Sequence, residues 1–214
     1  MEKPLAIDLF CGLGGWTNGL LAEGYWVVGF DIERQDYGTG GYPGQLVLQD
    51  VLTLDGARFK NATLIVASPP CQKYSYMAMP WSKAKNLEKE YLNGVRSVQE
   101  LNALFDACFR IQREASKAAG RHIPMVVENV RGAQKWVGKA KAHYGSYHLW
   151  GDVPISVPIA SGGIKQGGNW WHDPESMSQR FSSKSNSRKA ASAMIAKIPE
   201  PLARHIAKTY HGKA

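Results

Sequence analysis

The first two-thirds of the chain alternate short apolar runs with segments of helical spacing. Apolar runs that predict β-strands lie at residues 5–10, 25–31, 46–48, 63–67 and 124–127, and helical spacing is found at 16–23 and 97–118. Such alternation is typical of a parallel sheet with helices on both faces. We therefore expect an α/β fold, in which the carboxyl ends of the strands meet at one edge and ligands bind there.

The pattern changes after Gly151. Residues 161–169 are rich in glycine, and residues 176–187 are rich in serine. A final helix is expected over residues 201–210, because Pro201 suits the first turn of a helix. We divide the chain into a core (1–150), an irregular segment (151–193) and a C-terminal helix that returns to the core (194–214).

The chain is basic and has few cysteines. Its formal net charge is +8, and nine Lys or Arg residues against three Asp or Glu lie between Ser161 and the end. This charge favours a polyanionic partner such as nucleic acid. The three cysteines are widely spaced and form no CxxC or Cys/His cluster, which argues against a disulfide framework or a metal site. No apolar run approaches the ~20 residues of a membrane span and the first residues form no signal peptide, so we expect a cytoplasmic protein without membrane contact.

A cysteine follows two prolines directly after the fourth apolar run. The segment reads Ser68-Pro69-Pro70-Cys71-Gln72 and comes after Leu64-Ile65-Val66-Ala67. The prolines restrict the backbone and place the thiol on a stiff turn at the carboxyl end of a buried strand. A nucleophile is presented in this way, so the segment predicts covalent chemistry through Cys71.

A glycine-rich loop closes the first strand and opens the first helix. It reads Asp8-Leu9-Phe10-Cys11-Gly12-Leu13-Gly14-Gly15. Glycines in this place let the backbone approach a ligand and let the helix N-terminus face it. Thr17 occupies the third glycine position of a dinucleotide fingerprint, which disfavours an NAD-linked oxidoreductase. We interpret the loop as part of a site for a nucleoside-bearing ligand, with a tight structural turn as the alternative.

Two aspartates follow the next two strands. Asp31 ends the second strand about 20 residues after the loop, where an acidic side chain typically accepts hydrogen bonds from ribose hydroxyls. Asp50 follows the third strand and could bind an adenine amino group. Each aspartate taken singly could equally be a helix cap or a turn residue. Three strand ends in register, each with a suitable group, favour the ligand site.

Glu128 and Asn129 end the last of the buried strands. A glutamate in such a position loses its hydration and needs a partner. One interpretation is a buried structural acid. The other is a carboxyl group that faces the same crevice as Cys71, hydrogen-bonds the ring nitrogen of a substrate base and shares a proton with it.

These segments, in this order, resemble the cytosine-C5 DNA methyltransferases. The glycine-rich loop is similar to the family's S-adenosylmethionine loop, Pro70-Cys71-Gln72 to its catalytic Pro-Cys-Gln, and Glu128-Asn129-Val130 to its Glu-Asn-Val. Residues 105–113 resemble the helix between the last two motifs. The final conserved block, which folds back onto the cofactor site, is matched by Ile198-Pro199-Glu200-Pro201-Leu202-Ala203. The resemblance covers roughly residues 5–150 and 194–210.

The resemblance implies the Rossmann-like sheet of S-adenosylmethionine-dependent methyltransferases, with helices on both faces. It also implies methyl transfer from S-adenosylmethionine to C5 of cytosine in duplex DNA, with the target base flipped out. Cys71 would attack C6 of the base, and Glu128 would engage N3. The cofactor would be lined by Phe10, Gly12, Gly14, Asp31, Asp50 and Pro70.

Three features depart from the family pattern. The segment that should hold a target recognition domain is short, about residues 150–193. Recognition would then be reduced, supplied by a protein partner, or done around Trp170 and Trp171, for which buried packing is the alternative. No arginine-rich catalytic block is evident, and Arg180 is the nearest candidate for contact with cytosine O2. Ala196-Lys197 stands where the family carries an asparagine on the cofactor.

Residues 74–83, which follow the nucleophile, are expected to form a mobile catalytic loop. Its side chains would either wedge into a stacked duplex or pack together, and they include Tyr74, Tyr76, Met77, Met79 and Trp81.

Other functions are weighed against this one. A tRNA cytosine-C5 methyltransferase and a catalytically inactive nucleic-acid-binding relative are the alternatives. An amino-methylating DNA enzyme is disfavoured, because Cys71 stands where such enzymes place an aromatic residue after two prolines. The compact size suggests an orphan modification enzyme, in the cytoplasm of a bacterium or of a phage-infected host.

Overall fold

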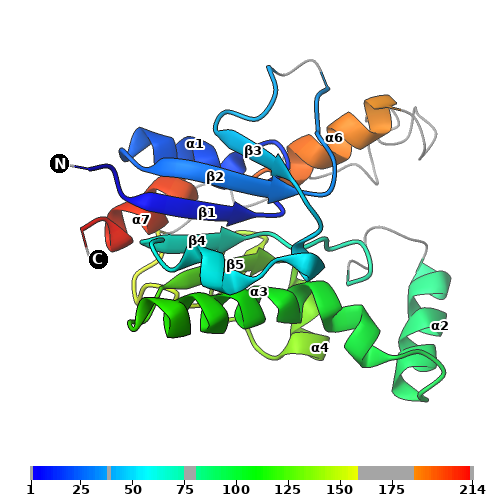
Figure 1. Ribbon diagram of the computed structural model, residues 1–214. Helices are drawn as coiled ribbons and strands as arrows, with labels where there is room; N and C mark the ends of the chain where they lie inside the picture. The colour runs from blue at the N-terminus through cyan, green and yellow to red at the C-terminus, as the bar shows by residue number, and fades with distance from the viewer. Residues whose placement is uncertain (1, 38–39, 75–80, 159–185, 213–214) are drawn as a thin grey trace.

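A single mixed sheet of seven strands runs through the described part of the chain (Figure 1). The computed structural model describes residues 2–37, 40–74, 81–158 and 186–212. The strands are β1 (Leu5–Leu9), β2 (Trp26–Asp31), β3 (Gln45–Leu48), β4 (Leu64–Ala67), β5 (Met125–Asn129), β6 (Ala142–Tyr144) and β7 (Tyr147–Gly151). Their order in the sheet is β3-β2-β1-β4-β5-β7-β6. The first five of these run parallel, whereas β7 is antiparallel to both β5 and β6.

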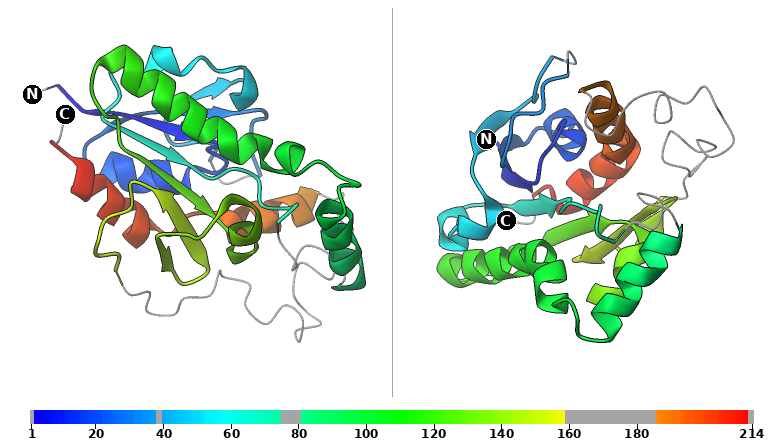
Figure 2. Two further views of the ribbon diagram at one scale, coloured as in Figure 1. Left: turned by 90° about the horizontal axis from the view of Figure 1, so that it is seen from below. Right: turned by 90° about the vertical axis from the view of Figure 1, so that its right-hand side faces the viewer.

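Helices cover both faces of this sheet, which confirms the expected α/β fold (Figures 1 and 2). The described helices are α1 (Gly15–Ala22), α2 (Trp81–Leu92), α3 (Val98–Ala119), α4 (Gln134–Val137), α6 (Asn186–Ala196) and α7 (Glu200–Tyr210). Short 3-10 helices are η1 (Val51–Thr53), η2 (Gly56–Phe59) and η4 (Arg131–Ala133). The helices α1 and α7 lie on one face, and α3 and α4 lie on the other. Both α2 and α6 extend beyond the carboxyl ends of the parallel strands.

The parallel strands bury apolar side chains on both faces, as a sheet covered by two helical layers requires. Along β4, Ile65 joins the cluster under α3, whereas Leu64 and Val66 join the cluster under α1 and α7. The strand therefore reads as a continuous apolar run in the sequence. Because both faces are buried, a shift of one strand along its neighbours would expose apolar side chains to water. The carboxyl ends of the strands are therefore held in register.

The helix α3 begins and ends close to where the sequence predicts. Ser97 is its N-cap, and its hydroxyl accepts the N–H of Glu100 at 3.2 Å. Gly120 ends the helix in the left-handed region, with φ of 64°, which glycine adopts without strain. Phe105, Cys108 and Ile111 share the buried face, as their helical spacing indicates.

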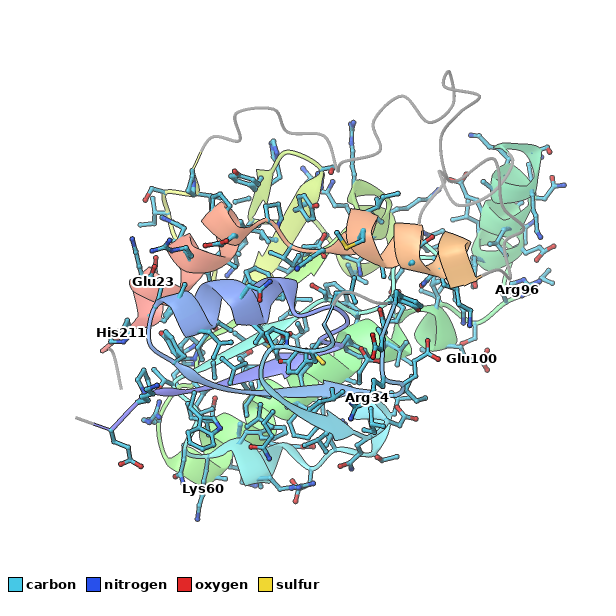
Figure 3. All side chains as sticks on the ribbon, turned by 90° about the horizontal axis from the view of Figure 1, so that it is seen from above. Glu23, Arg34, Lys60, Arg96, Glu100 and His211 are labelled. Carbon is cyan, nitrogen blue, oxygen red and sulfur yellow. The ribbon has the colours of Figure 1, made fainter. Side chains whose placement is uncertain are left out.

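The last segment of the chain packs on the first helix. A Cβ atom at Gly15 would meet the backbone nitrogen of Ile198, so only glycine allows this approach. Glu23, at the end of α1, accepts a hydrogen bond from Nε of Arg204 at 2.6 Å, and Figure 3 shows Glu23 beside α7. The helix α7 thus lies against α1.

The sequence did not predict the elements α2, β6, β7 and α6. The helix α2 covers residues that the loop interpretation partly included, because its Lys- and Glu-rich sequence carries little apolar periodicity. The strands β6 and β7 hold three and five residues, too few for a clear alternation. The helix α6 starts at the end of the serine-rich run and continues past residue 193, where we drew a boundary. The division into three segments stays a prediction.

Candidate active site

Cys71 and Glu128 follow neighbouring strands of the sheet. The strands β4 and β5 pair in parallel, with Ala67 opposite Val127. Glu128 directly follows Val127, and Cys71 comes four residues after Ala67. Because both strands run in the same direction, the thiol and the carboxyl group reach the same edge of the sheet. The fold thus places two of the three residues that the sequence assigns to catalysis at one edge of the sheet, and the third, Arg180, lies outside the described residues.

The turn that carries Cys71 is held from three sides. The N–H of Ser68 continues the ladder to β1, with 3.1 Å to the carbonyl oxygen of Leu9. The side-chain amide of Asn129 donates to the carbonyl oxygen of Pro69 at 2.9 Å. The carbonyl oxygen of Cys71 accepts the N–H of Tyr74 at 3.0 Å. The Cys71 backbone is therefore fixed by bonds before and after it, and its side chain is partly exposed.

Tyr74 anchors the turn and does not belong to a mobile loop. Its ring is 4% exposed, and its hydroxyl donates to the carbonyl oxygen of Leu101 at 3.1 Å and Oδ1 of Asn102 at 3.0 Å. Asn102 in turn donates to the carbonyl oxygen of Trp136 at 2.9 Å. The interpretation that Tyr74 wedges into a stacked duplex is wrong, because its side chain is buried and its hydroxyl is bonded to residues of α3. The sequence does not reveal these partners. Residues 75–80 lie outside the described part of the chain.

A Tyr74→Phe variant is expected to lose about 1 kcal/mol of unfolding free energy, because the buried hydroxyl that Leu101 and Asn102 share as a donor is removed. It should also lower kcat more than the matched Tyr25→Phe variant. Tyr25 is buried as well and donates to the carbonyl oxygen of Ala207 at 2.9 Å, far from the Cys71 turn. Urea unfolding and steady-state methylation of both variants measure the two effects. Equal kcat values in the two variants would contradict a role for Tyr74 in holding the turn.

Glu128 is buried beside a tyrosine that the sequence did not single out. The carboxyl group is 4% exposed, and Glu128 pairs with Leu149 across the β5–β7 ladder. Burial, followed by the nearby charge of Glu128, raises the pKa of Tyr147 to about 12. The Tyr147 hydroxyl donates to the carbonyl oxygen of Lys197 at 3.1 Å. The short antiparallel strand β7 thus places the neutral phenol of Tyr147 near Glu128. This placement follows from the pairing of β7 with β5, which the sequence does not show.

Three residues of the glycine-rich loop adopt the left-handed backbone conformation, and the loop donates a hydrogen bond to Asp31. Phe10, Gly12 and Gly14 have φ of 57°, 50° and 71°. Phe10 is the only non-glycine residue with positive φ among those the structure describes, so the bend at the end of β1 stores strain there. The N–H of Gly12 donates to Oδ2 of Asp31 at 2.9 Å. Asp31 therefore stands at the cofactor edge that the sequence predicts, and it already holds the loop.

Asp50 caps a helix, which was one of its two interpretations. Its Oδ1 accepts the N–H of Leu52 at 2.9 Å at the start of η1. Two exposed apolar side chains lie near the two aspartates, Ile32 with 72% and Leu52 with 48% of its surface exposed. Exposed apolar residues next to carboxylates are suited to a ligand with an apolar ring and polar substituents.

Asp8 is fully buried beneath the glycine-rich loop. The hydroxyl of Thr17 donates to its Oδ2 at 2.6 Å, and Oδ1 has no hydrogen-bond partner within the described ranges. Burial raises the pKa of Asp8 from 3.8 to about 8; the charge of Asp31 adds to this, and the bond from Thr17 opposes it. The carboxyl group is therefore mainly protonated at neutral pH.

An Asp8→Asn variant is expected to flatten the dependence of stability on pH. The folded protein keeps the Asp8 proton between pH values of about 4 and about 8, where the unfolded chain loses it. The free energy of unfolding of the native protein therefore falls as pH rises through this window. Urea unfolding of both proteins across the window gives the difference in slope. The same slope in both would show that Asp8 is not the titrating group.

Three side chains that the sequence singles out are not placed by the structure. Arg180, Trp170 and Trp171 lie outside the described residues. Where the structure does describe the chain, no three His, Cys, Asp or Glu side chains come together as a metal site would need. Its described helices include none with the length and apolar character of a membrane span.

Residues 5–135, more than half of the chain, match the family model described as C-5 cytosine-specific DNA methylase. The chain belongs to this family. A comparison with curated proteins gave no match. The match covers the glycine-rich loop, Cys71 and Glu128, and it stops before the β6–β7 hairpin that contributes Tyr147.

Solved structures of several methyltransferases are similar over part of their length. A protein encoded in an E. coli prophage, named as a DNA modification methyltransferase, has 24% identity and a TM-score of 0.40, over 61% of this chain and 33% of that chain. The S. pombe Dnmt2 methyltransferase has 17% identity and a TM-score of 0.42, over 64% and 37%. The methyltransferase EhMeth of Entamoeba histolytica has 14% identity and a TM-score of 0.45, over 75% and 57%. The matched part thus spans between 33% and 57% of these chains, and likenesses of this size carry no conclusion about activity.

This chain differs from the family pattern at Ala196-Lys197, where an asparagine is usual. The carbonyl oxygens of Ile195 and Lys197 lie 3.5 and 3.1 Å from the Tyr147 hydroxyl, which donates to them. The segment is thereby tied through Tyr147 to the neighbourhood of Glu128. Backbone contacts fix this part of the chain without the asparagine.

Proposed function

We propose that this protein transfers a methyl group from S-adenosylmethionine to C5 of cytosine in DNA, through a covalent bond between Cys71 and C6 of a flipped base. The observation that carries the proposal is the pairing of β4 with β5, which brings Cys71 and Glu128 to one edge in a chain of the methylase family. The bonds around the Cys71 turn support it, because a nucleophile must be held in one orientation.

The two residues divide one difficult step into easier ones. Cytosine C5 is a weak nucleophile until C6 is substituted. Attack by the Cys71 thiolate forms the S–C6 bond and moves electron density towards C5, while a proton shared between Glu128 and N3 offsets the negative charge on the ring. C5 would then take up the methyl group as the bond between the methyl carbon and the sulfonium sulfur breaks, which would leave S-adenosylhomocysteine. Loss of the C5 proton to solvent and breakage of the S–C6 bond restore the aromatic ring and the thiolate.

The residues at the edge fit S-adenosylmethionine, which supplies an electrophilic methyl group when it is bound. Each oxygen of Asp31 accepts at least one backbone N–H, and a carboxylate keeps lone pairs for ribose hydroxyls. Asp50 keeps acceptor capacity for an adenine amino group, and the exposed Ile32 and Leu52 offer apolar contact to the ring. In this proposal the cofactor is also bordered by Phe10, Gly12, Gly14 and Pro70.

Duplex DNA is the substrate that the family and the charge favour. Lys83, Lys85 and Lys89 are exposed on α2, which extends beyond the carboxyl edge of the sheet (Figure 2). Lysines in this position can bind phosphates on either side of a base that is flipped towards Cys71. Phosphate contacts of this kind make binding weaken steeply as salt rises. Arg180 is kept as the candidate for cytosine O2, and a protein partner for target recognition belongs to the same proposal.

The proposal is tested by incubating the protein with methyl-labelled S-adenosylmethionine and, in parallel, duplex DNA, single-stranded DNA and tRNA of mixed sequence. Digestion to nucleosides then locates the label. Label in 5-methylcytosine from duplex DNA is the expected result. Label in RNA alone would overturn the DNA substrate, and label in N4-methylcytosine would overturn the covalent route. No label in any substrate, with cofactor binding intact, would overturn activity of the protein acting alone and leave an inactive relative or an enzyme that needs a partner.

A further inference from the structure

The connection between β2 and β3 lacks a helix in its described residues, 32–37 and 40–44. Parallel neighbours are usually joined by a helix that covers the sheet. Here the ring of Tyr42 lies over the sheet instead. A Cβ atom at Gly29 in β2 would collide with the Tyr42 hydroxyl and lie 2.8 Å from Sγ of Cys11. Gly29 therefore makes room for Tyr42, and the two residues fit as a pair.

Tyr42 is hydrogen-bonded to the first helix. Its hydroxyl lies 2.5 Å from Oγ1 of Thr17. The single proton of Thr17 goes to Asp8, 2.6 Å away, so Tyr42 is the donor in its bond to Thr17. A chain of donors thus runs from the β2–β3 connection through α1 to β1. All of it is at least partly buried, where each such bond counts for more than at the surface.

The same connection rests on the glycine-rich loop. A Cβ atom at Gly14 would lie 2.5 Å from Cδ of Pro43 and 3.2 Å from Cδ2 of Tyr42. Gln35, from the same connection, is the nearest side chain to Gly12. Its Oε1 would lie 3.7 Å from a Cβ atom at Gly12. Gly14 is also the N-cap of α1 and provides no side-chain cap. The loop is therefore held from outside by the connection, and Tyr42 is the residue that ties the connection down.

We infer that Tyr42 is a positioning residue, which locks the β2–β3 connection onto the glycine-rich loop and thereby sets the affinity for the nucleoside part of the cofactor. The effect on cofactor rests on the proposed function; the lock itself does not. Tyr42 acts through the loop backbone and Thr17, so its loss should change cofactor binding and leave the chemical step at Cys71 unchanged. Thr17 gains a role here that the glycine of a dinucleotide fingerprint could not fill, because glycine has no hydroxyl.

The test compares Tyr42→Phe and Gly29→Ala with the native protein. The first removes the hydroxyl, and the second keeps every hydrogen-bonding group but places a methyl group where the hydroxyl lies. Tyr210→Phe is the matched control, because Tyr210 donates to the carbonyl oxygen of Asp152, away from the loop. Hydrogen exchange of the amides of residues 12–16 is measured without cofactor, and the Kd for S-adenosylmethionine and S-adenosylhomocysteine by calorimetry.

Both variants are expected to speed exchange in the loop, and to raise both Kd values by about fivefold, as the loss of one hydrogen bond would. The value of kcat at saturating cofactor should stay within about twofold, as a defect confined to cofactor binding requires. Unchanged exchange in Tyr42→Phe, or a fall in Tm alone, would overturn the lock and leave Tyr42 as packing. If the native protein binds neither cofactor nor product, the proposed function fails, and the exchange rates still decide whether the lock exists.

Discussion

A Cys71→Ala variant is expected to lose methyl transfer by a factor of about 10⁴ or more, because a nucleophile has no substitute in a covalent route. Its Kd for S-adenosylmethionine should stay close to the native value. The bonds that hold the turn use the backbone of Cys71, and the side-chain bond to Pro69 comes from Asn129. These bonds therefore remain when the thiol is removed. Methylation rate and calorimetric cofactor binding, measured on the same preparation, separate the two effects.

The same variant also tests the covalent bond directly. DNA with 5-fluorocytosine at its target sites blocks loss of the C5 substituent, so the native protein should remain attached to the DNA under denaturing conditions. Cys108→Ala is the control, because Cys108 is buried within α3, where burial raises the pKa of its thiol. An adduct with the native and Cys108→Ala proteins, and none with Cys71→Ala, is expected. An adduct that persists in Cys71→Ala would assign the nucleophile elsewhere.

A Glu128→Gln variant is expected to lower kcat by about 10²–10⁴-fold, the range for loss of a positioned acid–base group. Glutamine has nearly the same volume, so the buried site and its contact with Tyr147 should keep their shape. Unlike the acid, it cannot share a proton with N3. The KM for DNA should change much less than kcat, because charge develops on the base only after Cys71 attacks.

Glu100→Gln is the control for this variant. Glu100 is an exposed acid in the first turn of α3 and is labelled in Figure 3. Steady-state kinetics of the two variants should show a loss of kcat in Glu128→Gln alone. Native kcat in Glu128→Gln would leave the buried acid with a structural role and would contradict the proposed mechanism.

The sequence predicts the strands and the edge of the sheet because each rests on a local pattern. A short apolar run such as residues 64–67 is typical of a strand buried between helical layers, and the following Pro-Pro-Cys turn then lies near the strand end. In the sequence, Thr17 is informative only because it departs from the dinucleotide-binding fingerprint. In the structure it donates to Asp8 and accepts from Tyr42, two residues from different segments. Such a role needs the fold to be known.

The unpredicted parts of the site come from contacts between distant segments. Tyr147 reaches Glu128 because β7 enters the sheet antiparallel beside β5. Tyr74 reaches Asn102 across 28 positions of sequence. Neither tyrosine stands in a motif whose spacing points to its partner, since a hydroxyl can bond any acceptor that the fold brings near. The position of Asp50 could be predicted, but its cap on Leu52 depends on a 3-10 turn with no strong signal.

The packing of residues 198–207 against α1 has a consequence for biosynthesis. These residues complete the apolar layer that buries Trp16 and Leu20, and Ile198 closes on the backbone of Gly15. While this segment is still inside the ribosome, apolar side chains on one face of the nascent sheet remain exposed to water. The glycine-rich loop, made among the first residues, thus acquires its final support among the last. Fragments that stop before Ile198 are expected to be substrates for proteases and chaperones, and we expect a complete fold only in chains extended through α7.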